Sequence, residues 1–242
     1  MLLIRDLRKN FAGLAAVSEL SFDVGRGQFV GIIGPNGAGK TTLLNLMTGY
    51  LRPTTGSIEF EGREIGGLAP YEVCRLGIGR TFQIVQPFQE MTVEDNVMTG
   101  ALFSSNARVS VAEGRRRAEQ PLKLTGLWER RYLPAGALTI GQKKKLELAR
   151  ALAVNPKVLL LDEVMGGVTK REVDELVAVL RRIHASGVTI MMIEHVIEAI
   201  LQLAQHVVVL NFGKKLFEGG PREVIEHPAV IESYLGRPLN VE

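Results

Sequence analysis

Residues 34–42 read Gly34-Pro35-Asn36-Gly37-Ala38-Gly39-Lys40-Thr41-Thr42 and follow directly on the apolar run from Phe29 to Ile33. The pattern G-x-x-x-x-G-K-S/T between a strand and a helix is typical of a loop that binds nucleotide phosphates. Its glycines turn successive backbone N–H groups toward phosphate oxygens, and the helix that begins near Gly39 adds its positive dipole end. We expect Lys40 to bridge the β- and γ-phosphates and the Thr41 hydroxyl to bind Mg²⁺. A chance glycine turn is the alternative, and the flanking strand and helix argue against it.

Around this loop, short β-rich runs alternate with helical patterns, which indicates an α/β fold. The runs are Gln28 to Ile33, Ser57 to Phe60, Val158 to Leu161, Val188 to Ile193 and His206 to Leu210. Those at 158 and 188 are apolar almost throughout, as in parallel strands covered on both faces. Between residues 91 and 156 helical signals replace them, starting at Thr92. The sequence predicts one P-loop nucleotide-binding domain, with an α/β core at 1–90 and 157–242 and a helical subdomain at 91–156.

Two of the predicted strands end in residues that suit phosphate chemistry. Asp162 and Glu163 follow Val158 to Leu161, at the strand end where parallel α/β sheets gather their ligand-binding groups. We expect Asp162 to bind Mg²⁺ through water and Glu163 to act as the general base on the attacking water. The alternative is that both acids cap the next element. His195 follows the run from Ile190 to Ile193 and is placed to donate to the γ-phosphate, although a lone histidine is more often structural.

Composition excludes several classes of protein. The 242 residues carry a formal charge of only +3, and the basic runs at 115–117 and 143–145 lie beside acids in helix-like segments. Solvated helix faces explain these runs best, with contact to anionic lipid as the alternative, so we expect no nucleic-acid partner. The single Cys74 excludes an internal disulfide and a cysteine zinc cluster. Apolar runs fall short of the roughly 20 residues of a membrane span, and no signal-peptide pattern follows Met1, so we expect a cytosolic protein.

Taken in order, these motifs resemble those of the nucleotide-binding subunits of ATP-binding cassette (ABC) transporters, over essentially the whole chain. The resemblance identifies Gln83 with the family's Q-loop glutamine, His195 with its H-loop histidine, and Phe11 with the aromatic residue that stacks on adenine. The signature motif L-S-G-G-Q corresponds to Leu138, Thr139, Ile140, Gly141 and Gln142. Here Thr139 replaces Ser and keeps the hydroxyl, Ile140 replaces Gly and disfavours a positive φ, and Val164 replaces the usual Pro.

The resemblance implies an ATP hydrolase that is coupled to transmembrane transport, with an antiparallel β part at its N-terminus. It implies ATP and Mg²⁺ as cofactors, with catalytic roles for Glu163, His195 and Gln83 and metal contacts from Thr41, Gln83 and Asp162. Two subunits of this family sandwich two ATP molecules, so that each phosphate loop faces the partner's signature helix. Gly141 and Gln142 open a helix here, whose N–H groups together with the Thr139 hydroxyl suit a γ-phosphate.

Within the family, the chain looks most like the ATPase subunits of branched-chain amino acid importers. The similar stretches are Arg80 to Gln83 with Met91 to Val97, Met192 to His195, and the ending Pro228 to Gly236. The resemblance implies permease subunits, a second ABC ATPase subunit and a substrate-binding protein as partners, and a peripheral position on the inner face of the cell membrane. A lipopolysaccharide-export ATPase, a soluble non-transport ABC ATPase and a phosphotransferase with a phosphate loop are the alternatives.

Overall fold

A computed structural model describes residues 1–104 and 109–235 of the chain. It divides into two compact units, one formed by Met1–Val73 with Thr189–Glu242 and the other by Cys74–Val188. The chain passes from the first unit to the second within α2 (Pro70–Leu76). Among the described residues, the helices are all too short or too polar to cross a membrane. Gly236, with which the predicted C-terminal likeness ends, lies outside the described residues.

The first unit begins with an antiparallel sheet in the order β2-β1-β4-β5. Its strands are β1 (Leu2–Phe11), β2 (Leu14–Val24), β4 (Thr55–Phe60) and β5 (Arg63–Glu64). One face is apolar, because alternate side chains such as Leu2, Ile4, Ile58 and Phe60 are buried. The antiparallel N-terminal part that the family resemblance implied is therefore confirmed.

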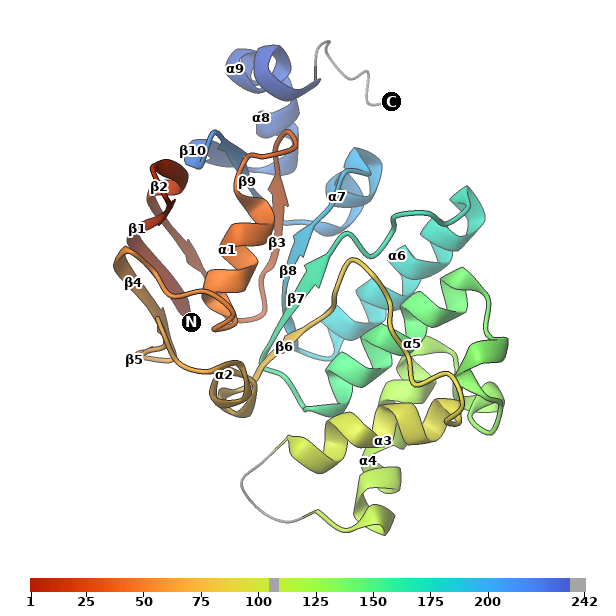
Figure 1. Cartoon of the computed structure of the whole chain (residues 1–242). Coiled ribbons are helices and arrows are strands. Elements are labelled where there is room, and N and C mark those ends of the chain that lie inside the picture. The colour runs from red at the N-terminus through yellow and green to blue at the C-terminus, as the bar shows by residue number, and fades with distance from the viewer. Residues whose placement is uncertain (105–108, 236–242) are drawn as a thin grey trace. The chain divides into compact units, whose positions relative to one another are not determined.

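A second set of strands in this unit carries the phosphate loop. β3 (Phe29–Ile33) pairs in parallel with β8 (Thr189–Ile193) and with β9 (His206–Asn211), and β10 (Lys214–Gly219) pairs antiparallel to β9. Every residue of β3 and β8 is buried, which confirms the strands predicted from apolar runs. The helices of the unit are α1 (Lys40–Met47), α7 (Ile197–Leu203), α8 (Pro221–Glu226) and α9 (Pro228–Val230), followed by a π-helical turn at Ile231–Leu235 (Figure 1).

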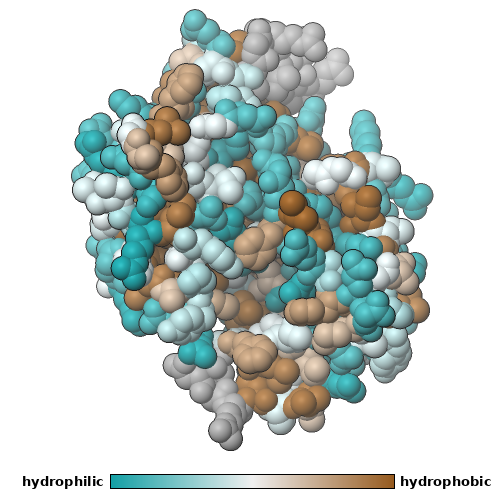
Figure 2. Space-filling model, in the orientation of Figure 1, coloured by the Kyte–Doolittle hydropathy of each residue, from teal (hydrophilic) through white to brown (hydrophobic). Residues whose placement is uncertain are grey.

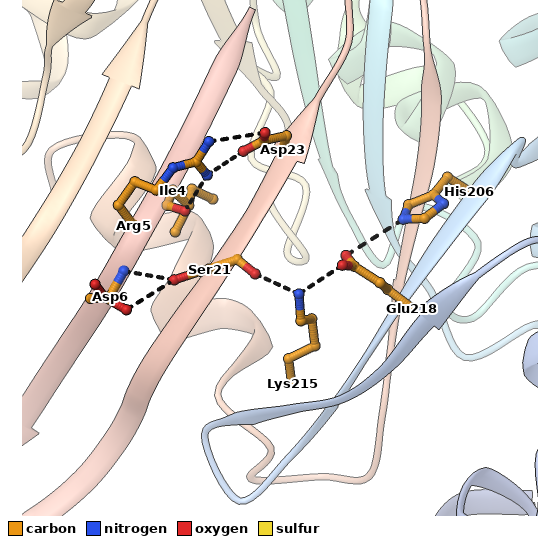
Figure 3. Close-up of polar contacts among 8 residues, drawn as sticks. All are labelled: Ile4, Arg5, Asp6, Ser21, Asp23, His206, Lys215 and Glu218. Carbon is orange, nitrogen blue, oxygen red and sulfur yellow. Dashed lines mark hydrogen bonds and ion pairs between the residues drawn. The ribbon is translucent and has the colours of Figure 1, made fainter.

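Polar side chains join the two sheets of the first unit along β2 and β10 (Figure 3). The Lys215 ammonium donates to the backbone carbonyl of Ser21 over 2.7 Å and to the Glu218 carboxylate over 2.7 Å. His206 lies 3.6 Å from the same carboxylate. These groups are partly exposed, so their ion pairs contribute little free energy, and their main effect is to fix β10 against β2.

The second unit combines two parallel strands with a helical bundle. The strands are β6 (Ile78–Arg80) and β7 (Val158–Asp162), and the helices are α3 (Val93–Phe103), α4 (Val111–Thr125), α5 (Ile140–Ala153) and α6 (Lys170–Ala185), with 3-10 turns at Trp128–Arg130 and Ala135–Ala137. Thr92 caps α3, since its hydroxyl accepts from the Asp95 N–H. The predicted helices between residues 91 and 156 are confirmed, while the subdomain boundaries stay a prediction.

The helices of this bundle share an apolar core. Its buried members are Val93, Val97, Ala101, Ala118, Leu122, Leu127, Ala135, Leu138, Leu146, Ala149 and Ala153. Some large apolar side chains remain on the surface of the unit, among them Ile84, Phe88, Phe103 and Val111. Figure 2 shows apolar side chains interspersed with polar ones over the helices. The described helices therefore have a closed interior and an outer surface that is apolar in places.

Candidate functional site

The phosphate loop lies between β3 and α1, where the sequence placed it. Gly34 and Gly39 have φ angles of +147° and +98°, which side-chain-bearing residues rarely adopt. The Lys40 ammonium is buried and donates to the carbonyl oxygens of Gly34 and Pro35 over 2.7 and 2.9 Å. Thr41 and Thr42 follow in the first turn of α1. The loop thus presents a cation and a helix N-terminus at the end of a buried strand, a combination that binds phosphate.

Two of the loop glycines are required by close backbone neighbours. A Cβ at Gly34 would lie 2.1 Å from the carbonyl oxygen of Leu210 in β9, and a Cβ at Gly39 would lie 2.4 Å from that of Ala16 in β2. In addition, the Gly213 N–H donates to the Ala38 carbonyl over 3.1 Å. The loop is therefore held from two sides by backbone that cannot move aside. Between these contacts, Asn36 and Gly37 form its exposed tip.

The first unit brings two further predicted residues near this loop. β3 and β8 are parallel and in register from Phe29 opposite Ile190 to Ile32 opposite Ile193, so the loop and His195 follow the same ends of adjacent strands. The His195 side chain is exposed, while Glu194 before it is buried. Phe11 ends β1, 43% exposed, in the hairpin whose second strand contains Ala16. The common strand edge is the one where ligands of parallel sheets bind.

In the second unit, Asp162 ends β7 as a buried carboxylate. Arg80, the last residue of the adjacent β6, donates to it over 3.0 Å, and the two side chains are 7% and 3% exposed. Because both charges are removed from water, loss of either side chain would leave the other as an uncompensated buried charge. The Thr81 hydroxyl accepts from the Asp162 N–H over 3.2 Å and so fixes the strand end. The sequence predicted the position of Asp162 but not its arginine.

Glu163 and Gln83, two residues with predicted catalytic roles, lie in contact. The Gln83 amide nitrogen donates to the Glu163 carboxylate over 2.7 Å. The backbone of Glu163 has a φ of +49°, an unusual value for a residue other than glycine, and its carbonyl accepts from the Gly166 N–H over 3.3 Å. The structure therefore brings these two residues together across 80 residues of sequence.

The signature residues form the start of α5. Thr139 is the N-cap, and its hydroxyl accepts from the Gln142 N–H while the Gln142 side chain accepts from the Thr139 N–H. Ile140 occupies the first helical position with ordinary helical geometry, and this explains how a β-branched residue replaces glycine there. Leu138 is buried in the apolar core of the bundle, together with Leu146 and Ala149 of α5. The helix predicted from Gly141 onward is confirmed.

The structure adds three charged residues of α5 that pattern reasoning missed. Lys144 and Glu147 are only 5% and 6% exposed, and Arg150 lies one turn further along the same face. Burial raises the pKa of Glu147 to about 7, although the Phe82 N–H donates to its carboxylate. The sequence did contain a signal for these residues, namely their spacing of three positions on a helix whose other face is apolar. The run of lysines at 143–145 made this face look solvated instead.

This raised pKa predicts a pH-dependent cost in stability. An unfolded Glu147 releases its proton near pH 4.5 and the folded one near 7, so between these values the folded chain binds one proton more. The free energy of unfolding therefore falls as the pH rises from 4.5 to 7, by up to about 3 kcal/mol. We expect Glu147→Gln to remove this fall, as measured by urea unfolding at pH 5, 6, 7 and 8.

Glu175→Gln is the matched control. Its carboxylate is on the surface with a pKa lowered by the hydrogen bond from Lys145, so this variant should keep the wild-type slope between pH 5 and 8. A Glu147→Gln curve that runs parallel to the wild type over the same range would show that the Glu147 carboxyl does not titrate there.

Comparison with protein families gives two matches. Residues 17–166 match the model of the ABC transporter family, and residues 214–239 match a model described as branched-chain amino acid ATP-binding cassette transporter. The first match contains the phosphate loop, Gln83, the signature residues, Asp162 and Glu163. The second covers β10 and the C-terminal helices, outside the nucleotide-binding motifs.

Curated relatives are similar over nearly the full length. The chain is 37% identical to the high-affinity branched-chain amino acid transport ATP-binding protein BraF of Pseudomonas aeruginosa, over 96% of each chain. It is 33% identical to the lipopolysaccharide export system ATP-binding protein LptB of Acidithiobacillus ferridurans, over 100% of this chain and 99% of that one. The similar proteins thus include a branched-chain amino acid transport subunit, which the sequence motifs favoured, and a lipopolysaccharide export subunit, which was one of the alternatives.

Solved structures share the fold. The ADP conformation of MJ1267, an ATP-binding cassette of an ABC transporter, matches with a TM-score of 0.89 and 33% identity, over 98% of this chain and 99% of that one. The dimeric structure of MJ0796, a bacterial ABC transporter cassette, matches with a TM-score of 0.81 and 25% identity, over 92% and 99%. The P-loop α/β fold predicted from the sequence is confirmed by these neighbours.

Proposed function

This chain belongs to the ABC transporter family, and from that premise we propose that it is the ATP-hydrolysing subunit of a membrane importer for branched-chain amino acids. The observation that carries the substrate class is the match of residues 214–239 to the branched-chain amino acid cassette model, because it lies outside the motifs that all ABC ATPases share. The similarity to BraF over 96% of both chains supports the same class.

In this proposal the first unit supplies the residues that contact the adenine and the phosphates. Phe11 stacks on the adenine, Lys40 binds the β- and γ-phosphates, and backbone N–H groups of residues 34–42 surround the phosphate oxygens. Thr41 and Asp162 offer the hard oxygen donors that Mg²⁺ prefers, with Gln83 as a further amide oxygen. Mg²⁺ usually takes one or two carboxylates of a protein and completes its shell with phosphate and water. When bound, Mg²⁺ neutralises charge on the phosphates.

Hydrolysis then depends on Glu163, Gln83 and His195. The Glu163 carboxylate accepts a proton from the attacking water, and the Gln83 amide, 2.7 Å from that carboxylate, keeps it oriented. His195 donates toward the γ-phosphate, where negative charge increases during the reaction. The signature residues Thr139, Gly141 and Gln142 serve a γ-phosphate of a second subunit through the N-terminus of α5.

The same proposal assigns the partners. A second ABC ATPase subunit forms the dimer, as the dimeric structure of MJ0796 supports. The segment after Gln83, in which Ile84 is 73% and Phe88 49% exposed, contacts a cytoplasmic helix of the permease. A substrate-binding protein completes the system on the other side of the membrane. The chain itself acts at the cytoplasmic face through the permease.

Transport assays test this function directly. Tagged chain and the permease that co-purifies with it are placed in vesicles with internal ATP and Mg²⁺, and uptake of labelled leucine, isoleucine and valine is measured with the matching binding protein. We expect no uptake by vesicles that are loaded with ATP and EDTA in place of Mg²⁺, and we expect ATP turnover that rises with the amino acid. Lipopolysaccharide-stimulated turnover without amino acid uptake would instead support an exporter like LptB.

A further inference from the structure

One face of α5 carries three charged residues, each of which bonds to the backbone of residues 82–86. The Lys144 ammonium donates to the Gln83 carbonyl over 3.0 Å, and the Arg150 guanidinium donates to the Gln86 carbonyl over 3.0 Å. Between them, the Glu147 carboxylate accepts from the Phe82 N–H. The spacing of three residues places all of them on one side of the helix. The segment that contains Gln83 is therefore attached to the signature helix through its main chain.

Lys144 makes a second bond that the other two residues do not share. Its ammonium also donates to the carbonyl oxygen of Glu163, over 3.3 Å. That carbonyl belongs to a residue with a φ of +49°, and such strained backbone persists only where the surrounding structure fixes it. The Gly166 N–H also donates to this oxygen, over 3.3 Å. Lys144 thus helps to hold Glu163 in the conformation that directs its carboxylate.

Gln83 and Glu163 are consequently connected both through their side chains and through their backbones. Their side chains bond to each other over 2.7 Å, and their carbonyls both accept from one buried ammonium. We propose that Lys144 is a positioning residue for ATP hydrolysis, which fixes the Glu163 carboxylate relative to the Gln83 amide and links both to α5. The proposal rests on the proposed function, since it takes Glu163 as the general base.

The chemistry of a lysine suits this role better than that of an apolar residue. Burying an ammonium is costly, and an apolar side chain of similar volume in its place is often neutral or stabilising for the fold. A residue kept only for packing therefore does not need the charge. Two carbonyl oxygens from segments 80 residues apart in sequence do need a donor with several N–H groups, which the ammonium provides.

The test compares Lys144→Met with Lys144→Arg in steady-state ATP hydrolysis. We expect Lys144→Met to lower kcat by about 10- to 100-fold and to leave the KM for ATP unchanged, because misplacing a catalytic group affects the reaction step. Lys144→Arg keeps donors within reach of both carbonyls and should restore most of kcat. Lys145→Met is the matched control, since the adjacent Lys145 bonds to Glu175 on the surface and should keep wild-type kcat.

A second measurement covers the case in which Lys144→Met folds poorly. Lys144→Gln retains a shorter donor and should give an intermediate kcat.

In a Glu163→Gln background, single-turnover hydrolysis should not fall further when Lys144 is changed, because both residues act through one carboxylate. Additive losses there, or a loss of ATP binding and melting temperature in step with kcat, would overturn the proposal. If Glu163→Gln itself keeps wild-type turnover, the proposed function has the wrong base; if Glu163→Gln loses turnover and Lys144→Met does not, only the role of Lys144 is wrong.

Discussion

Glu163→Gln is expected to lower steady-state ATP turnover by about 100- to 10,000-fold, the usual contribution of a general base. Glutamine has nearly the same shape and can still bond to Gln83, but it cannot accept a proton from water. Binding of ATP should therefore persist while hydrolysis becomes very slow. Turnover with Mg²⁺ measures the first effect, and size-exclusion chromatography with and without ATP measures the second, since a trapped ATP complex should elute as a dimer.

Glu175→Gln controls for the loss of a carboxylate elsewhere in the same unit. Glu175 lies on α6 and bonds to Lys145 on the surface, so its variant should hydrolyse ATP at the wild-type rate and remain unaffected in elution. Normal hydrolysis by Glu163→Gln together with a monomer in ATP would contradict both the assignment of the base and the two-subunit sandwich.

Gly34→Ala is expected to have the largest effect on the phosphate loop. The new Cβ would lie 2.1 Å from the Leu210 carbonyl oxygen, and a φ of +147° is a region that essentially only glycine adopts. Neither obstacle can be relieved by rotating a side chain, so the loop or β9 has to move. We expect a loss of about 3 kcal/mol in the free energy of unfolding and a large loss of ATP affinity. Urea unfolding and titration with a fluorescent ATP analogue measure these two quantities.

Gly37→Ala separates the clash from the effect of the substitution itself. Gly37 also has a positive φ, +80°, but apart from Gly37 itself and its two chain neighbours, no atom of the described residues lies within 4 Å of its added Cβ. The variant should lose only about 1 to 2 kcal/mol of stability, the cost of a left-handed residue. If Gly34→Ala proves as mild as Gly37→Ala, the close contact with Leu210 is not present in solution.

Much of the candidate site was predictable because its residues follow buried strands. Gly34 follows β3, Asp162 ends β7 and His195 follows β8 after Glu194, and an apolar run with a polar end can be recognised without tertiary structure. The start of α5 was predictable for a similar reason, since Thr139 and Gln142 form a capping box that is local in sequence. The roles of these residues in catalysis stay predictions that the variants above examine.

Local sequence also misled in one place. The run Lys143 to Lys145 resembles a solvated helix face, yet Lys144 is buried while Lys145 bonds to a surface acid. Adjacent helix positions differ by about 100° in direction, so three consecutive lysines cannot share one environment. Composition of a run therefore says little about the burial of its members.

The sequence by itself determined the P-loop fold class, the position of the phosphate loop and the order of the motifs, because strand and helix periods and glycine turns are encoded over a few residues. Only the tertiary structure decided which polar and charged groups contact one another. Arg80 reaches Asp162, Gln83 reaches Glu163, and Lys144 bonds to the carbonyls of both Gln83 and Glu163. These contacts join segments about 20 to 80 residues apart, and their geometry depends on how β6, β7 and α5 pack rather than on any local pattern.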